Sequence, residues 1–153
     1  MIIRNEKVVN IENARIFWKN FSGKESRYNR EGDRNFEVEI PDEQVAQEMA
    51  ADGWNVKIQP PREEGDTPRY HMPVAVSYRN YPPSIYKVTS HRKVLLDEET
   101  VGSLDRDEII NVDLVLRGSS WEVNGNTGIK AYVRDMYVTI EENMFAEKYE
   151  FED

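Results

Sequence analysis

Residues 121–140 read WEVNGNTGIKAYVRDMYVTI, and this stretch decides which fold the rest of the chain must complete. Asn124-Gly125 is the strongest hairpin signal in the sequence, because both residue types accept the positive φ angles of a two-residue turn. After the turn, apolar residues alternate with polar ones, and we expect the phase to hold without a break through Ile129, Ala131, Val133, Met136, Val138 and Ile140. The stretch therefore predicts a hairpin whose second strand is long and buries one face throughout.

Several other segments show the same strand-like pattern of apolar and β-branched residues. In chain order they are residues 8–18, 36–40, 54–58, 70–79, 85–90, 92–96 and 109–117. One helix is expected after residue 41. Asp42 is a suitable N-cap, Val45, Ala46 and Met49 fall at helical spacing, and Gly53 would end the helix. A second, short helix would fit within residues 97–104.

The order of these elements favours a mainly β fold, because there is no βαβ rhythm and no internal repeat. We expect an antiparallel β-barrel like the oligonucleotide-binding (OB) fold, closed or partly closed, since closure removes exposed strand edges. One short helix and an added hairpin complete this prediction. A β-sandwich is the alternative architecture.

Length and composition limit the class of protein. A chain of 153 residues is long enough for one domain with a real core. The absence of cysteine excludes both a disulfide framework and a thiolate metal site. The N-terminal residues lack the apolar stretch of a signal peptide, and no run approaches the length of a membrane span. We therefore expect a soluble, cytoplasmic protein.

The net charge of −9 is unevenly distributed. Residues 141–153 hold six carboxylates and one lysine, and so carry five of the nine negative charges. We expect residues 1–140 to form the folded domain and residues 141–153 an acidic, disordered tail. Such a tail would compete with a polyanion or recruit partner proteins. The residues predicted to do so are Glu141, Glu142, Phe145, Glu147, Tyr149, Glu150, Phe151, Glu152 and Asp153.

Two segments of the body interleave aromatic and basic residues, which is the pattern that single-stranded nucleic acid requires. Unpaired bases stack on aromatic rings, while cations follow the phosphates. The first segment supplies Phe17, Trp18, Lys19, Phe21, Lys24, Arg27, Tyr28, Arg30 and Arg34. The second supplies Tyr78, Arg79, Tyr81, Tyr86, Lys87, Arg92 and Lys93. The alternative is chance clustering on a solvated face.

Residues 19–34 are polar, basic and contain glycine, which indicates a long, flexible loop that could close over DNA. The alternation in residues 36–40 turns Glu37 and Glu39 outward and makes that strand face a poor DNA surface.

Each aromatic residue also has a structural alternative. Trp54 and Trp121 are expected in the core or at its edge, because a tryptophan on a strand is usually packed there. Trp18 shares an alternation with Ala14 and Ile16, so it could also be core, which would turn Phe17 outward. For Tyr78, Tyr81 and Tyr86 the sequence favours binding and structure equally.

Catalysis finds little support in the sequence. No common catalytic or phosphate-binding motif is present, and the two histidines stand apart. Two carboxylate clusters could in principle serve a metal-dependent nuclease, namely Asp97, Glu98 and Glu99, and Asp105, Asp107 and Glu108. We expect them instead in solvated turns and caps, and so expect no metal, no cofactor and no enzymatic activity.

Three segments together resemble single-stranded-DNA-binding proteins of the bacteriophage type. They are RNFEVEIPDEQVAQEMAADGWNVK (residues 34–57), HMPVAVSYRNYPPSIYKVT (71–89) and NVDLVLRGSSWEVNGNTGIKAYVRDMYVTIEE (111–142). The resemblance covers most of residues 12–142 and rests on the overall residue pattern and on the order of the segments. It implies an OB-fold protein that coats single-stranded DNA during replication and recombination, without catalysis, in the host cytoplasm if phage-encoded.

Many proteins of this type end in an acidic tail whose terminal phenylalanine contacts replication or recombination proteins. Here Phe151 is followed by Glu152 and Asp153, so the tail matches in acidity and departs at its tip. The favoured hypothesis is therefore a non-catalytic protein that binds single-stranded DNA with little sequence specificity. The alternatives are a structural or adaptor β-protein of a virion and, least favoured, a nuclease. Homo-oligomer formation stays open.

Overall fold

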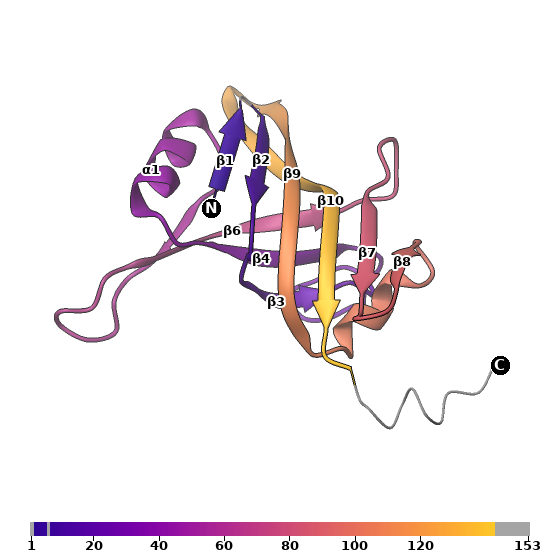
Figure 1. Cartoon of the computed structure of the whole chain (residues 1–153). Coiled ribbons are helices and arrows are strands. Elements are labelled where there is room, and N and C mark those ends of the chain that lie inside the picture. The colour runs from indigo at the N-terminus through magenta and orange to yellow at the C-terminus, as the bar shows by residue number, and fades with distance from the viewer. Residues whose placement is uncertain (1, 6, 143–153) are drawn as a thin grey trace.

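The computed structural model describes residues 2–5 and 7–142. Figure 1 shows these residues as a strongly curved sheet with the longer helix at its side. The strands are β1 (Ile2–Asn5), β2 (Val8–Ile11), β3 (Ile16–Asn20), β4 (Arg34–Ile40), β5 (Lys57–Gln59), β6 (Arg69–Val76), β7 (Ser84–Val88), β8 (Lys93–Leu96), β9 (Ile109–Val123) and β10 (Asn126–Ile140). The helices are α1 (Glu43–Asp52) and a 3₁₀-helix, η1 (Val101–Asp105).

The strands form one sheet whose main path runs β1-β2-β9-β10-β6-β4-β3. β5 adds to β6, while β7 adds to β10 and carries β8. In Figure 1, β9 and β10 stand upright and β6, β4 and β3 cross behind them. The architecture is thus mainly β and OB-like, as predicted. The path is not closed, because its two end strands, β1 and β3, do not pair with each other among the described residues.

The pairing is not purely antiparallel, which corrects the sequence-based expectation. β10 pairs antiparallel with β9 along its whole length but parallel with β6 and with β7. It is long enough to take these two partners one after the other, β6 near Tyr132 and β7 from Asp135 onward. β7 with β8 therefore forms the added hairpin on the same side of β10 as β6.

The predicted hairpin at Asn124-Gly125 is confirmed. The two residues have φ angles of 52° and 82°, the left-handed values that a type I′ turn requires, and Val123 pairs with Asn126 directly across it. The expectation of an unbroken phase along β10 is wrong, since Val133 and Met136 are three residues apart and yet both are buried. A register shift between Val133 and Asp135 absorbs the extra residue, so that the same face stays in the core.

The core lies between the inward faces of β4, β6, β9 and β10. Phe36, Val38 and Ile40 of β4 are buried in strict alternation, as the sequence predicts. α1 closes one end of the core with Ala46 and Met49. The helix begins and ends where expected, because the Asp42 side chain accepts a hydrogen bond from the backbone N–H of Val45 and Gly53 adopts a φ of 110°.

Among the other elements, two expectations need correction and the second, short helix is confirmed. In residues 54–58 only the last two belong to a strand, since Trp54 is buried and β5 starts at Lys57. The second helix is the short η1, whose Val101 and Leu104 are buried. Trp121, expected in the core or at its edge, is 45% exposed because β9 and β10 extend beyond the core at their turn.

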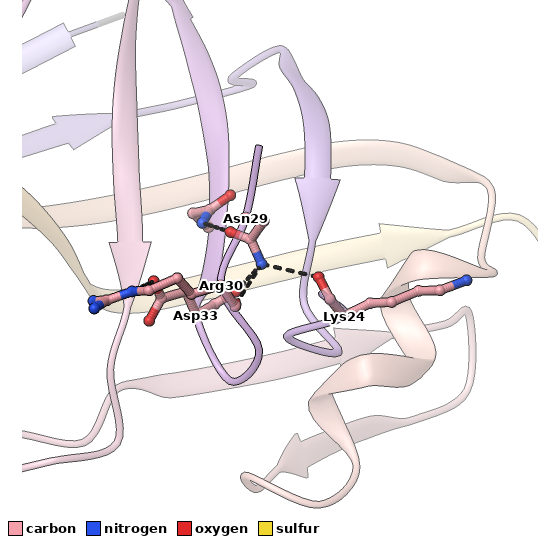
Figure 2. Close-up of polar contacts among 5 residues, drawn as sticks. Lys24, Asn29, Arg30 and Asp33 are labelled. Carbon is pink, nitrogen blue, oxygen red and sulfur yellow. Dashed lines mark hydrogen bonds and ion pairs between the residues drawn. The ribbon is translucent and has the colours of Figure 1, made fainter. Parts of the chain in front are cut away.

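The loop between β3 and β4 is organised around one side chain, Asn29, and is not an open, flexible loop (Figure 2). The Asn29 amide donates hydrogen bonds to the carbonyl oxygens of Lys24, Arg30 and Asp33 at 2.9–3.0 Å. Its side-chain oxygen accepts a hydrogen bond from Asn35 of β4 at 2.8 Å. The loop is therefore held in one shape before any ligand arrives.

We predict that Asn29→Ala loosens this loop while leaving the sheet intact. The loss of four hydrogen bonds, each with a net contribution of about 0.5–1.5 kcal/mol when buried and less here because water can replace them, should lower the free energy of unfolding by about 1–2 kcal/mol. Amide hydrogen exchange should accelerate in residues 23–33 and stay unchanged in β9 and β10. Exchange in the loop that matches the wild-type chain would contradict the assigned role of Asn29.

Candidate nucleic-acid interface

A broad cleft of about 1210 Å³ opens on the outward side of β4, β6 and β10. The end of the β3–β4 loop forms one wall, and the projecting arm of the β9–β10 hairpin forms the other. The cationic side chains that line it are Arg30, Arg34, Arg79 and Lys130, and the acidic ones are Glu31, Asp33, Glu37 and Glu98.

Most of the acids in the cleft are held by partners. Asp33 pairs with Arg30 at 3.4 Å, and Glu98 pairs with Arg34 at 3.6 Å. Glu37 lies 2.7 Å from Nδ1 of His71. Arg79 and Lys130, in contrast, have no ion-pair partner among the described residues. The cleft can therefore offer positive charge to an anion although the protein as a whole is acidic.

A ladder of alternating rings and cations begins in this cleft, where Lys130 and Tyr132 line it, and continues beside it to Arg117 and Tyr81. The Arg117 guanidinium sits 4.6 Å from the ring centre of Tyr132 and 5.1 Å from that of Tyr81. The ammonium of Lys130 lies 5.3 Å from the ring centre of Tyr132. Arg117 and Tyr132 meet because they are directly opposed on β9 and β10, on the outward face of both strands. We call Tyr81, Arg117, Lys130 and Tyr132 the cation–aromatic ladder.

Trp121 adds a further aromatic surface at the hairpin arm. It is paired across the strands with Gly128, and its indole lies so close that a Cβ atom on Gly128 would be only 2.6 Å from the ring. The absence of a side chain at residue 128 thus lets the indole lie flat against the backbone, where it is 45% exposed and lines the cleft.

A second aromatic cluster occupies the other end of β10. Tyr86 of β7 stacks on Tyr137 of β10 with ring centres 5.1 Å apart and planes 9° from parallel. Lys93 of β8 places its ammonium 4.8 Å from the Tyr86 ring centre and 5.7 Å from that of Tyr137. Tyr86 and Lys93, both predicted from the sequence, are therefore brought together with a residue that was not.

The residues of the first predicted segment divide into two groups. Phe21 is fully buried against Phe36, and the ammonium of Lys19 donates to the carbonyl oxygens of Leu104 and Asp107 at 2.6 and 2.8 Å. Both side chains are thus used by the fold. The remaining loop residues, Lys24, Arg27, Tyr28 and Arg30, are exposed, and Tyr28 reaches 90% exposure.

The second segment divides in the same way. Lys87 forms an ion pair with Asp107 at 2.6 Å and donates to the Ser103 hydroxyl, so its charge is used internally. Tyr78 lies half-buried beneath Arg34, and burial is the main cause that raises its pKa to about 12. The residues that face solvent are Arg79, Tyr81, Arg92 and Lys93.

Of the two alternatives for Trp18, the core position is wrong, because the indole is exposed and the expected alternation with Ala14 and Ile16 is broken. Its φ angle is 51°, and the pairing of β3 with β4 shifts in register between Phe17 and Asn20. This irregularity turns Lys19 inward and leaves Trp18 72% exposed. Such a backbone costs about 1–3 kcal/mol for a non-glycine residue, and strain of this kind is typical of functional sites. The ring contacts Phe17 and His71 edge-on, at 4.8 and 5.9 Å between centres.

The sequence analysis missed the most concentrated part of this surface. Arg117, Trp121, Lys130, Tyr132 and Tyr137 all lie in β9 or β10 and were not selected. The signal was present, because Lys130 and Tyr132 occupy outward positions that alternate with the buried Ala131 and Val133. Pairing across the hairpin would have added Arg117 to them.

The carboxylates considered for a nuclease serve the fold. Both oxygens of Asp105 accept backbone hydrogen bonds, from Phe21 at 2.7 Å and from Ser22 at 2.9 Å. Asp97 caps the turn before η1, and hydrogen bonds from Thr100 are the main cause of its lowered pKa. Within residues 2–5 and 7–142, no three acidic or histidine side chains gather in a way that could hold a metal ion.

Of the predicted tail, only Glu141 and Glu142 lie within the described residues. The Glu142 carboxylate accepts hydrogen bonds from the hydroxyl and backbone N–H of Ser90, at 2.7 and 3.2 Å, and the hydroxyl contact is the main cause of its lowered pKa. The last described residue, Glu142, thus lies against the β7–β8 turn. The other predicted tail residues, Phe145, Glu147, Tyr149, Glu150, Phe151, Glu152 and Asp153, lie outside the described part.

No helix in the described part of the chain combines the length and the apolar character that a bilayer span demands.

Comparison with solved structures identifies the fold. The chain is similar to the single-stranded DNA-binding protein from bacteriophage Enc34 in its C-terminally truncated form, with a TM-score of 0.55, 10% identity and coverage of 90% of this chain and 87% of that one. It is similar to the same protein in complex with single-stranded DNA, with a TM-score of 0.54, 13% identity and coverage of 90% and 88%. The comparison with curated proteins gives no match.

The sequence itself carries the family assignment. A model of the family described as a putative phage single-stranded-DNA-binding domain matches residues 2–151, nearly the whole chain. The resemblance noted in the sequence and the OB-like fold agree with this match. The chain belongs to the family of putative phage single-stranded-DNA-binding domains.

Proposed function

We propose that this protein binds single-stranded DNA, without catalysis, in the cleft bounded by β6, β10 and the β3–β4 loop. The observation that carries the proposal is the cation–aromatic ladder, in which Arg117 lies between the rings of Tyr81 and Tyr132. The family assignment supports the same ligand, as does the ligand of the solved Enc34 complex.

Each part of the ladder has a role in this proposal. Exposed rings offer flat apolar surfaces on which unpaired bases stack, with a contribution of about 1–3 kcal/mol per base. Arg117 and Lys130, already beside those rings, would contact the phosphates that join the stacked bases. Stacking tolerates every base, because each has a π-face. We therefore propose binding with little sequence specificity.

The biological role follows from this chemistry. A protein that covers unpaired strands would coat the single-stranded DNA exposed during phage replication and recombination, in the host cytoplasm. The structural use of Asp105 and Asp107 supports a protein without nuclease activity. We propose further that residues 141–153 serve as an acidic tail that competes with DNA or recruits replication and recombination proteins. The contact of Glu142 with Ser90, two and three residues before the exposed Arg92 and Lys93, supports this proposal.

Removal of the central ring tests the proposed site. Tyr132→Ala should weaken binding of oligo-dT by about five- to 150-fold, the equivalent of one lost stacking interaction. Tyr132→Phe keeps the ring and should bind as the wild-type chain does. Fluorescence anisotropy of a labelled oligonucleotide measures both. Equal affinity of Tyr132→Ala and the wild-type chain would remove the ladder from the site.

A charge substitution tests the phosphate contact separately. Arg117→Gln should reduce the slope of log affinity against log salt by about 0.7, the value for one phosphate contact on a single strand. Arg134→Gln is the matched control, because Arg134 is exposed on the same hairpin but pairs with Asp135 at 3.4 Å. If both variants changed the slope equally, Arg117 would have no special role.

Deletion of residues 143–153 tests the tail, since it removes four carboxylates and one lysine. If the tail competes with DNA, affinity for oligo-dT should rise at low salt and the gain should vanish at high salt, where the charges are screened. An unchanged affinity at low salt would leave the recruitment of partners as the tail's role.

A further inference from the structure

A second pocket, of about 200 Å³, lies apart from the cleft at the other edge of the same curved surface. Its walls are Phe17 and Trp18 of β3, with Tyr70 and His71 of β6, and its rim carries Arg15, Glu39, Gln59 and Arg69. No residue lines both this pocket and the cleft. We propose that this pocket holds one nucleotide of the same DNA strand, with the base against Phe17 and Trp18 and its phosphate at Arg15 or Arg69. The proposal rests on the proposed function and extends its site.

The shape and chemistry of the pocket fit a nucleotide. Trp18 and Phe17 offer ring faces and edges to a planar base, and His71 lies 5.4 Å from Phe17 between ring centres. Arg15 and Arg69 are both exposed at the rim and can reach a phosphate. The one carboxylate there, Glu39, already pairs with Arg15 at 3.7 Å, so its repulsion of a phosphate is partly offset.

The backbone conformation at Trp18 indicates that the fold itself holds the indole in its exposed position. A positive φ angle at an aromatic residue is uncommon, and here the register shift of β3 holds it in place. A lysine contact secures the same turn, since Lys19 is anchored to the carbonyl oxygens of Leu104 and Asp107. The fold thus fixes an apolar ring in water, where only a ligand would cover it.

The pocket and the cleft are joined by one contact. Glu37 lines the cleft, His71 lines the pocket, and the two side chains meet at 2.7 Å. From β10 across β6 and β4 to β3 there are three strand spacings, or about 14 Å. OB-fold sites accommodate about 4–16 nucleotides, so one strand can occupy both places. From the sequence, Glu37 and Glu39 were expected to make the outer face of β4 a poor DNA surface. In the structure His71 and Arg15 pair with these carboxylates, which reduces their repulsion of a phosphate.

A length series of oligo-dT tests this proposal. Trp18→Asn removes the ring and keeps a residue that tolerates a positive φ angle, while Trp18→Tyr keeps a ring. For short oligonucleotides, which fill only the cleft, Trp18→Asn should bind as the wild-type chain does. For longer ones it should bind about five- to 150-fold more weakly, and its affinity should stop rising at a shorter length. Trp18→Tyr should restore most of the difference.

Two controls separate the possible failures. Ile110→Ala removes another exposed apolar side chain, one on β9 that lines neither the cleft nor the pocket, and should change nothing. Arg69→Gln should reduce the salt slope for long oligonucleotides by about 0.7. Arg106→Gln should not, because Arg106, exposed at the end of η1, lines neither the cleft nor the pocket. Affinities of Trp18→Asn that equal the wild-type values at every length would overturn the nucleotide pocket and leave the cleft intact. No binding by the wild-type chain at any length would overturn the proposed function itself.

Discussion

The long pairing of β9 with β10 is the constraint on which the rest of the structure depends. Each strand has 15 residues, and the pair joins the β1–β2 end of the sheet to the β6, β4 and β3 end. A bulge at Arg134 keeps Val133 and Met136 on the buried face, although the sequence between them changes phase. The same register sets Arg117 opposite Tyr132 on the outward face. One set of backbone hydrogen bonds thus positions both the core and the ladder.

The ladder explains how a protein with a net charge of −9 can bind a polyanion. Binding depends on the local field and on fixed geometry more than on total charge. In the free protein, Arg117 already lies on two rings and Asn29 already ties the loop that walls the cleft. The loop and the Arg117 side chain therefore lose little conformational entropy when DNA binds, which reduces the entropic cost of binding.

Local patterns made the fold predictable, whereas the site needed contacts that lie far apart in sequence. The Asn124-Gly125 turn, the Asp42 cap and the alternation in residues 36–40 all act over a few residues, and all are confirmed. The parallel pairs of β10 and the bulge at Arg134 depend on tertiary packing, which no short pattern contains. Composition alone could not separate Phe21 and Lys87, which serve the fold, from Tyr81, which faces solvent. For Trp18 the sequence left core and binding open, because its exposure depends on a single left-handed residue that reverses the alternation.

Ultraviolet crosslinking of the full chain to oligo-dT, with the modified residues mapped by mass spectrometry, tests the central claim most directly. The claim is that DNA lies on the outward face of β6 and β10, across the ladder. Crosslinks at Tyr81, Trp121 and Tyr132 are the predicted result, since Trp121 and Tyr132 line the cleft and the exposed Tyr81 continues the ladder beside it. Crosslinks confined to the β1–β2 hairpin or to α1, with none at these three rings, would contradict the account.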